Sequence, residues 1–217
     1  MNVLNKSFTS IIFIVNFGFG QPSFTEHVIS TSSDGVHNVY AADVDSDGDM
    51  DVLSASEIDN TISWHENDGS EGFTTHEISS TVYGAYVVYP EDLDMDGDLD
   101  ILSASGGDNT IAWYENDGNQ IFTKHTISTS ALGVRSVYAK DVDGDGDMDV
   151  LSASFEDGEL PIAWYENDGS VSFTTHAIPT SANGAFHVHA SDVDSDGDMD
   201  ILSASTNDGR ITWYEND

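Results

Sequence analysis

A short acidic segment occurs four times in this chain, and its spacing constrains the fold more than any other feature. Each copy has nine residues, with Asp at positions 1, 3, 5, 7 and 9 and Gly at position 6. The copies begin 49, 49 and 51 residues apart, at 43–51, 92–100, 141–149 and 192–200, and each runs into Val/Ile-Leu-Ser-Ala-Ser. A repeat of about 50 residues is typical of solenoids and propellers.

Each repeat predicts four short strands rich in Val, Ile, Thr and aromatic residues and separated by Gly-containing turns. In the first repeat they are expected at 36–41, 51–56, 61–66 and 73–79. No helical pattern longer than a turn interrupts them. Four antiparallel strands per repeat form one propeller blade, so the predicted fold is all-β, a β-propeller of four-stranded antiparallel blades. Four visible repeats fit a four-bladed propeller or part of a larger one.

The predicted propeller covers residues 21–217, and its ends indicate how it closes. Residues 24–29 repeat the Phe-Thr-x-His-x-Ile pattern of the fourth strand, whereas residues 213–217 belong to a third strand. An N-terminal strand at 24–30 is therefore expected to complete the last blade and close the ring, which hides both edges. The two extra residues of the third repeat fall in 155–161, where we expect a surface loop.

Residues 1–20 predict a secretory signal peptide. Lys6 is their only charged residue, an apolar run follows at 11–19, and small glycines precede Gln21, the expected first mature residue. The run is shorter than the roughly 18–20 apolar residues of a membrane span; a buried strand is the alternative interpretation. The chain has no cysteine, which excludes disulfides and thiolate metal sites. We therefore expect a secreted or cell-surface protein, of bacterial type, without disulfides.

The charge excludes several partners. Asp and Glu number 40 against 5 Lys and Arg, a formal net charge of −35. Phosphate backbones repel such a chain, so we expect no nucleic-acid partner, and it does not suit a basic membrane-surface protein. Acidic chains can be disordered, but a hydrophobic fraction of 38% supports a core. The position of the carboxylates must then explain the acidity.

The acidic segments predict calcium sites. Ca²⁺ takes six to eight hard oxygens at about 2.3–2.6 Å, and alternating Asp side chains on a loop turned by Gly supply them, with a backbone carbonyl at position 7. Carboxylates this close repel one another unless a cation neutralises them. An exposed acidic turn is the alternative for one loop, but four loops in one register favour up to four Ca²⁺ ions. The predicted ligands are Asp43, Asp45, Asp47, Asp49, Asp51, Asp92, Asp94, Asp96, Asp98, Asp100, Asp141, Asp143, Asp145, Asp147, Asp149, Asp192, Asp194, Asp196, Asp198 and Asp200.

The residues after the loops distinguish among calcium families. Position 12 is Ser in every copy, not the bidentate Glu of an EF-hand, and a strand rather than a helix follows, unlike in dockerins. The Asp-x-Asp-x-Asp-Gly-Asp-x-Asp loops with their apolar strands resemble the FG-GAP-like, or VCBS-type, repeats of integrin-like β-propellers over residues 24–217. The resemblance implies calcium at the loops and an extracellular role in adhesion or ligand recognition, or beside enzymes. The Phe-Gly and Gly-Ala-Pro signatures are absent, and the four repeats contrast with the family's usual seven.

Two further sets of residues recur once per repeat. The histidines are too far apart to share a metal, so we expect them packed between blades and hydrogen-bonded. The tryptophans are expected in the core, with sugar stacking as the alternative. The histidines are His27, His76, His125 and His176, and the tryptophans are Trp64, Trp113, Trp164 and Trp213.

The functional expectation is a non-catalytic binding or adhesion scaffold. No serine-hydrolase, zinc-protease or phosphate-loop motif occurs, so no catalytic residue is assigned and the chain is not expected to be an enzyme. The expected partner is an unidentified extracellular protein or glycan. The alternative is a lectin-like propeller, or an accessory module of a larger surface enzyme, that binds through the tryptophans or through a variable position of the innermost strand. That position holds His37, Tyr86, Arg135 and Phe186.

Overall fold

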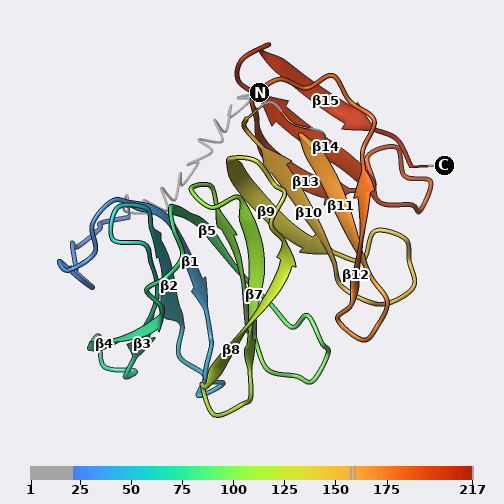
Figure 1. The fold of residues 1–217 in the computed structure, drawn as a ribbon. Helices are drawn as coiled ribbons and strands as arrows, with labels where there is room; N and C mark the ends of the chain where they lie inside the picture. Colours follow the sequence, from blue (N-terminus) through green and yellow to red (C-terminus); the bar gives the residue numbers. More distant parts are fainter. Residues whose placement is uncertain (1–21, 157, 159, 217) are drawn as a thin grey trace, which may run out of the picture.

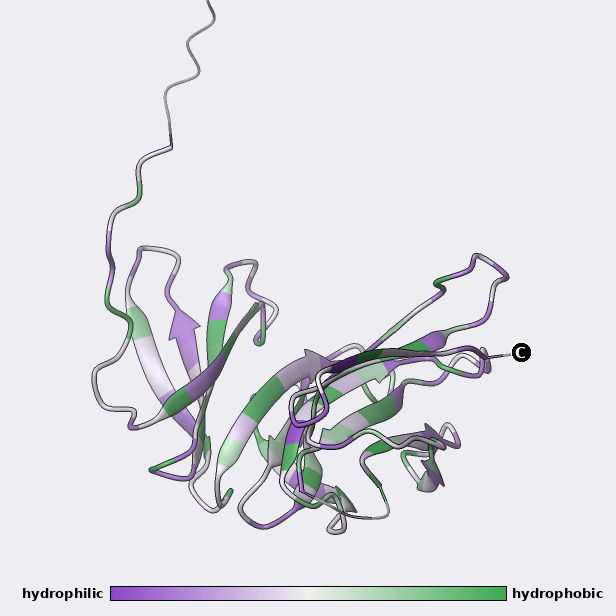
Figure 2. Cartoon of the chain, turned by 90° about the horizontal axis from the view of Figure 1, so that it is seen from above, coloured by the Kyte–Doolittle hydropathy of each residue, from purple (hydrophilic) through white to green (hydrophobic). Residues whose placement is uncertain are grey.

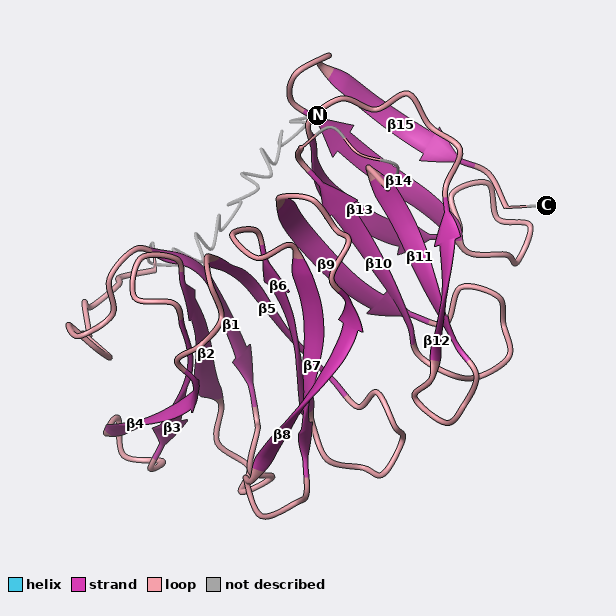
Figure 3. Cartoon of the chain, viewed as in Figure 1, coloured by secondary structure: helices cyan, strands magenta, loops and turns pink. Residues whose placement is uncertain are grey.

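The computed structural model describes residues 22–156, 158 and 160–216 of the chain. The predicted signal peptide, residues 1–20, lies outside them. Every regular element in the described part of the chain is a β-strand, as Figure 3 shows. No helix able to span a membrane occurs among these residues. The prediction of an all-β chain is confirmed.

The strands form four antiparallel sheets, and each sheet comes from one repeat, with its strands side by side in chain order. We call them blades 1 to 4. Blade 1 contains β1 (Val36–Ala42), β2 (Asp51–Ser56), β3 (Thr61–Asn67) and β4 (Phe73–Ser79). Blade 2 contains β5 (Ala85–Glu91), β6 (Asp100–Ser105), β7 (Thr110–Asn116) and β8 (Phe122–Ser128). Blade 3 contains β9 (Val134–Lys140), β10 (Asp149–Ser154), β11 (Ile162–Asn167) and β12 (Phe173–Ala177). Blade 4 contains β13 (Ala185–Ser191), β14 (Asp200–Ser205) and β15 (Arg210–Tyr214).

The hairpins place the acidic loops at one end of every blade. Ala42 pairs with Asp51 at the base of the first loop, so the loop directly joins the first two strands of the blade. The pairing continues outward, with Leu53 opposite Trp64. The insertion of the third repeat lies between β10 and β11, outside the strands, as predicted.

The hydrophobic core lies between neighbouring blades. Leu53 and Ile62 of blade 1 belong to one buried cluster with Val88 and Ile101 of blade 2. Equivalent clusters join blade 2 to blade 3 and blade 3 to blade 4. Figure 2 shows apolar residues recurring along the strands. Each blade therefore buries its apolar faces against its neighbours and not within itself, as expected for a repeat fold.

The blades form an open arc, with blade 1 and blade 4 at its two ends (Figure 1). The first strands of successive blades contact one another, whereas β1 and β13 share no comparable contact. Residues 22–30 form no strand; they lie beside blade 1, where His27 Nδ1 is 3.7 Å from Glu71 Oε2. The predicted closing strand at 24–30 is thus not formed in this structure, because β15 lies at the opposite end of the arc.

Candidate metal centres

The backbone of each acidic loop turns at two positions with positive φ. Position 4 has a φ of 59° at Ser46 and at Met95. Position 6 is Gly in every copy and has a φ near +100°, for example 98° at Gly48. This conformation is unfavourable for residues with a Cβ. The glycine therefore lets the loop curl so that alternate side chains approach one another.

Hydrogen bonds within the loop fix the carboxylates. In the first loop, Gly48 N donates to Asp43 Oδ2 at 3.1 Å and Asp47 N donates to Asp45 Oδ1 at 3.2 Å. Asp49 N donates to Asp47 Oδ1 at 2.9 Å. The same three bonds occur in the other loops. At position 1, Asp43 and Asp92 accept one such bond through Oδ2. Asp141 and Asp192 also accept a second one through Oδ1, from Gly144 N at 2.8 Å and from Ser195 N at 2.6 Å.

The Asp at position 9 ties the loop to the third strand. Asp51 is completely buried, and it accepts hydrogen bonds from Val44 N at 3.0 Å and from Asn67 N at 2.8 Å. The equivalent residues Asp100, Asp149 and Asp200 make the same pair of bonds. This carboxylate thus links three segments of its blade.

Three carboxylates gather in each loop. In every case one oxygen of each lies within 4.8 Å of the others. The groups are Asp43, Asp45 and Asp51; Asp92, Asp94 and Asp96; Asp141, Asp143 and Asp149; and Asp192, Asp194 and Asp200. Positions 1, 3 and 9 therefore converge in three loops, and positions 1, 3 and 5 converge in the second.

Position 5 lies outside the gathered group in three loops, and position 7 lies outside it in all four. In the first loop, the Asp49 carboxylate lies against Gly69 in the β3–β4 turn, where a Cβ would come within 2.4 Å of Asp49 Oδ2. The side chains of Asp98 and Asp147 lie against the equivalent turn glycines. Because these side chains pack against the turn, their carboxylates lie away from the gathered group. This agrees with the prediction that position 7 offers its backbone carbonyl to the ion.

Two observations indicate that the clusters suit a cation. Within the described residues, the buried oxygens Asp43 Oδ1 and Asp92 Oδ1 have no hydrogen-bond partner, although buried polar atoms are normally satisfied. The atoms gathered in each loop are also all carboxylate oxygens, the ligands that Ca²⁺ prefers. An ion at the centre of the first or second loop would bind the unpartnered oxygen there, and in all four loops it would lie between the gathered carboxylates.

The electrostatics point the same way. Burial, and then repulsion from neighbouring carboxylates, raises the pKa of Asp45 and Asp94 above the ordinary value. Burial raises the pKa of Asp100 to about 7, despite its two backbone hydrogen bonds. At Asp200 the backbone donors Asn216 and Val193 dominate instead and lower the pKa. At each Asp whose pKa is raised by burial, the ionised carboxylate is unfavourable without a counter-ion. A bound cation would remove that cost.

Sequence reasoning missed the asparagine of the Glu-Asn-Asp sequence after each Trp. Asn116 Nδ2 donates to Leu99 O at 3.3 Å in its own blade and to Val44 O, 3.4 Å away, in the acidic loop of blade 1. Asn167 and Asn216 make the equivalent bonds to the preceding blade. These asparagines therefore connect neighbouring acidic loops. The Glu-Asn-Asp sequence recurs in every repeat, but this recurrence by itself predicts only a turn and not a contact between blades.

The histidines and tryptophans form pairs within a blade. Trp113 and His125 stack with ring centroids 4.7 Å apart, and His125 Nε2 lies 2.6 Å from Glu115 Oε2. Blades 1 and 3 repeat this arrangement. His76, His125 and His176 are thus hydrogen-bonded, as predicted, but each packs on its own blade's tryptophan and not between blades. The prediction is wrong for His27, which lies exposed with Nδ1 3.7 Å from Glu71 Oε2. Trp64 and Trp113 are buried and Trp164 packs partly buried against the core, which confirms the predicted core role for these three. The prediction is wrong for Trp213, which is exposed on the last blade.

A family model for the FG-GAP-like repeat matches the chain at residues 43–103, 92–152 and 141–203. Each match runs from one acidic loop to the strand after the next loop, and together they cover most of the chain. The chain belongs to the FG-GAP-like repeat family. The four sheets of this FG-GAP-like protein are therefore propeller blades, and the resemblance inferred from the loops is confirmed.

Among solved structures, the chain is similar to a protein from Lactobacillus plantarum with a TM-score of 0.44 and 18% identity. The similarity covers 76% of this chain and 53% of that one, so this chain spans about half the length of its structural relative. No curated protein matches the chain.

Proposed function

We propose that this chain is a secreted calcium-binding β-propeller that acts as a non-catalytic binding or adhesion scaffold, with one structural Ca²⁺ in each blade. The observation that carries the calcium assignment is the convergence of three carboxylates per loop, within 4.8 Å, in all four repeats. The unpartnered buried oxygens of Asp43 and Asp92 support it.

The position of the loops supports a structural role for the ion. Each loop joins the first two strands, and its Asp at position 9 also holds the third strand. A cation at this point would neutralise buried carboxylates and fix three segments together. The ion would therefore stabilise the blade without taking part in a reaction.

A thermal melt tests this proposal. The chain is stripped with a chelator and then titrated with Ca²⁺, with Mg²⁺ as the control ion. Each site held about 100-fold above its dissociation constant adds about 2.7 kcal/mol if only the folded state binds. We expect a large increase in melting temperature with Ca²⁺ and a small one with Mg²⁺, since Mg²⁺ demands a tighter octahedral site. A cooperative melt that Ca²⁺ leaves unchanged would reject the calcium sites.

The secretion part of the proposal is supported by residues 1–20, whose charge and apolar run match a signal peptide. Expression of the full chain in a bacterium, followed by fractionation and N-terminal sequencing, tests it. We expect exported protein that begins at Gln21. Unprocessed protein in the cytosol would contradict export and leave the calcium proposal to its own test.

A second candidate function is glycan binding at the centre of the arc. The first strands of the four blades line a cavity of about 590 Å³. His37, Tyr86, Arg135 and Phe186 all lie in its wall, the Arg135 guanidinium lies 4.2 Å from the Tyr86 ring centroid, and His37 stacks on Tyr86. Flat rings beside a polar planar group suit sugar recognition. Buried Trp113, by contrast, has no surface for stacking on a sugar.

Glycan-array binding separates the two functions. If the cavity binds sugars, Tyr86→Ala should abolish a signal that the unchanged chain gives, while the calcium-dependent melt persists. Trp113→Phe serves as the control, since this buried ring does not reach the cavity. A signal that survives Tyr86→Ala, or no signal at all, would argue for the scaffold without a glycan site in the cavity.

A further inference from the structure

Neighbouring blades pack through one repeated seam. The forward face of a blade is formed by position 2 of the acidic loop, by Leu and Ala of the second strand, and by Ile and Trp of the third. In blade 2 these residues are Leu93, Leu102, Ala104, Ile111 and Trp113. The rear face of the next blade carries two residues of its first strand and one from each of the next two. In blade 3 they are Val134, Val137, Val150 and Tyr165.

The same seam occurs three times inside the chain, and its core residues are buried each time. Ile62, Ile111 and Ile162 occupy one equivalent position and are fully buried. Val88, Val137 and Val188 occupy an equivalent position on the rear face and are also buried. Equivalent apolar residues therefore form the interface at all three seams.

The two ends of the arc each present one half of this seam. On the forward face of blade 4, Ile211 is 90% exposed and Trp213 is 43% exposed. On the rear face of blade 1, Val39 is 62% exposed, and Val36 is exposed beside it. Repeat proteins normally cover their terminal faces with polar residues. Here both terminal faces keep the apolar residues of the internal seam, which marks them as interaction surfaces.

At each end of the arc, the described residues provide only one of the two groups that form the hydrogen bond between neighbouring acidic loops. Inside the chain, an asparagine amide donates to the loop carbonyl of the preceding blade, as Asn116 does to Val44 O. In blade 1, the one hydrogen bond that Asn67 Nδ2 donates within the described part of the chain goes to Met50 O of its own loop. In blade 4, the equivalent of Val44 is Val193, which is exposed. Asn67 and the Val193 carbonyl are thus the two halves of a fourth link.

Blade 4 has three strands in the described residues, and the sequence typical of a fourth strand occurs at the start of the same chain. Residues 24–29 carry Phe-Thr-x-His-x-Ile, the sequence of β4, β8 and β12, yet Phe24 is 93% exposed. In blade 3, Trp164 pairs with His176, so the same register would place His27 opposite Trp213. Six residues separate Ile29 from β1, as in all three internal connections between blades. This segment can therefore reach only a blade seated directly against blade 1.

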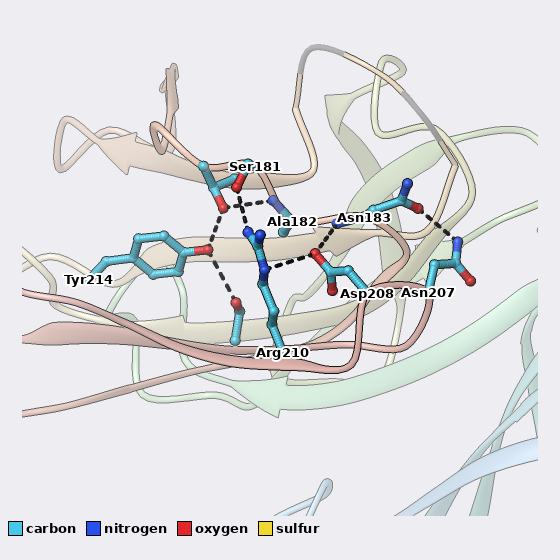
Figure 4. Close-up of polar contacts among 9 residues, drawn as sticks. Ser181, Ala182, Asn183, Asn207, Asp208, Arg210 and Tyr214 are labelled. Carbon is cyan, nitrogen blue, oxygen red and sulfur yellow. Dashed lines mark hydrogen bonds and ion pairs between the residues drawn. The ribbon is translucent and has the colours of Figure 1, made fainter.

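The exposed strand β15 is held in place by its own contacts, as Figure 4 shows. Arg210 contacts Asp208 and Ser181, and Asp208 Oδ2 accepts a hydrogen bond from Asn183 N at 3.2 Å. The Tyr214 hydroxyl lies 2.6 Å from Thr180 Oγ1. Ile211 and Trp213 are thus presented on an anchored strand, which is ready to accept a partner.

We propose that the forward face of blade 4 binds the rear face of blade 1 of a second copy of this chain, and that residues 24–29 of that second copy add the outer strand to β15. A second copy fits because it reproduces the internal seam without changing any blade. Joining the two faces within one chain would require all three packed seams to alter, since blade 1 and blade 4 lie at opposite ends of the arc (Figure 1). Such a head-to-tail contact either closes into a ring or extends.

Light scattering coupled to size-exclusion chromatography, in the presence of Ca²⁺, measures the mass of the chain over a range of concentrations. We expect a mass of at least two chains that falls on dilution. Ile211→Asp should give single chains, because it places a charge at the centre of the forward face. Ile121→Asp is the matched control, since Ile121 is exposed in a turn outside both faces. A chain that is monomeric at every concentration would overturn the proposal, including by closing on itself.

Mixing two variants tests the head-to-tail geometry. Ile211→Asp damages only the forward face, and Val39→Asp damages only the rear face, so each alone should be monomeric. An equimolar mixture should recover a dimer, because it contains one intact face of each kind. Circular dichroism checks that both variants fold, which we expect because Ile211 and Val39 are exposed. Association by either variant alone, or a mixture that stays monomeric, would refute this interface.

Discussion

Asp100→Asn should change the stability of the chain in opposite directions with and without calcium. Asp100 is completely buried and accepts backbone hydrogen bonds from Leu93 at 3.0 Å and from Asn116 at 2.8 Å. Asparagine has the same shape but no charge. It keeps one acceptor oxygen for these two donors and is a poorer Ca²⁺ ligand. The substitution therefore separates the cost of a buried charge from its benefit as a metal ligand.

The size of both effects follows from the site. Burial raises the pKa of Asp100 from 3.8 to about 7, so its ionised form at pH 8 costs about 4 kcal/mol. Replacement by a neutral amide relieves that cost but leaves one backbone donor unpaired, a loss of about 1–3 kcal/mol. In chelator the variant should gain about 1–3 kcal/mol, or at least 2 °C in melting temperature at about 2–4 °C per kcal/mol. In calcium it should lose about 2.7 kcal/mol per abolished site at about 100-fold over the dissociation constant.

Thermal melts at pH 8, in chelator and in saturating Ca²⁺, measure both changes, and calorimetric titration counts the sites. Asp100 holds position 9, which joins the gathered carboxylates in the other three loops, whereas its own loop gathers positions 1, 3 and 5. Asp98→Asn is the matched control: it removes one charge from the same loop at position 7, which lies outside the gathered group in every loop and packs against Gly118 here. We expect that control to retain four sites. If Asp100→Asn destabilised the chain equally under both conditions, Asp100 would be a structural hydrogen-bond acceptor and not a ligand.

Three further perturbations test other parts of the structure. Burial lowers the pKa of His65, whereas the unfolded chain takes up that proton below about pH 6.5, so stability should decline as the pH falls from 7.5 to 5.5. His65→Tyr, the residue of the other blades, should reduce this decline in urea unfolding, and an equal decline would contradict the reasoning. Gly97→Ala, at a φ of +99°, should cost about 1–3 kcal/mol and weaken calcium binding at its loop; an unchanged melt and titration would refute it. Trp113→Ala should cost about 3–5 kcal/mol in chemical unfolding, and a loss below 1 kcal/mol would show that the Trp113 seam is not a core.

Much of the blade was predictable because it is local. The alternation of apolar residues and the Gly-containing turns placed the strands of the first repeat close to their observed bounds. The acidic loops were predictable for the same reason: Asp43, Asp45 and Asp51 converge through bonds within one hairpin. Short-range chemistry of this kind is present in the residues themselves and repeats with them.

The contacts between strands and between blades were less predictable. The stacking of His125 on Trp113 depends on which residues face each other across β7 and β8. A recurring histidine does not reveal that register. The bond from Asn116 to Val44 O joins residues 72 positions apart, so it depends on how one blade sits on the next.

The number of blades is even harder to predict from the local sequence. Ile211 and Val39 have the same residue types and patterns as their buried equivalents, Ile162 and Val188. The pattern therefore predicts burial for all four, and only the arrangement of the blades shows that two of them are exposed. A repeat specifies the seam that it forms with its neighbours but not how many neighbours there are. The mismatch between an apolar pattern and an exposed position is thus informative: it marks the two faces at which we propose that a second copy of the chain binds.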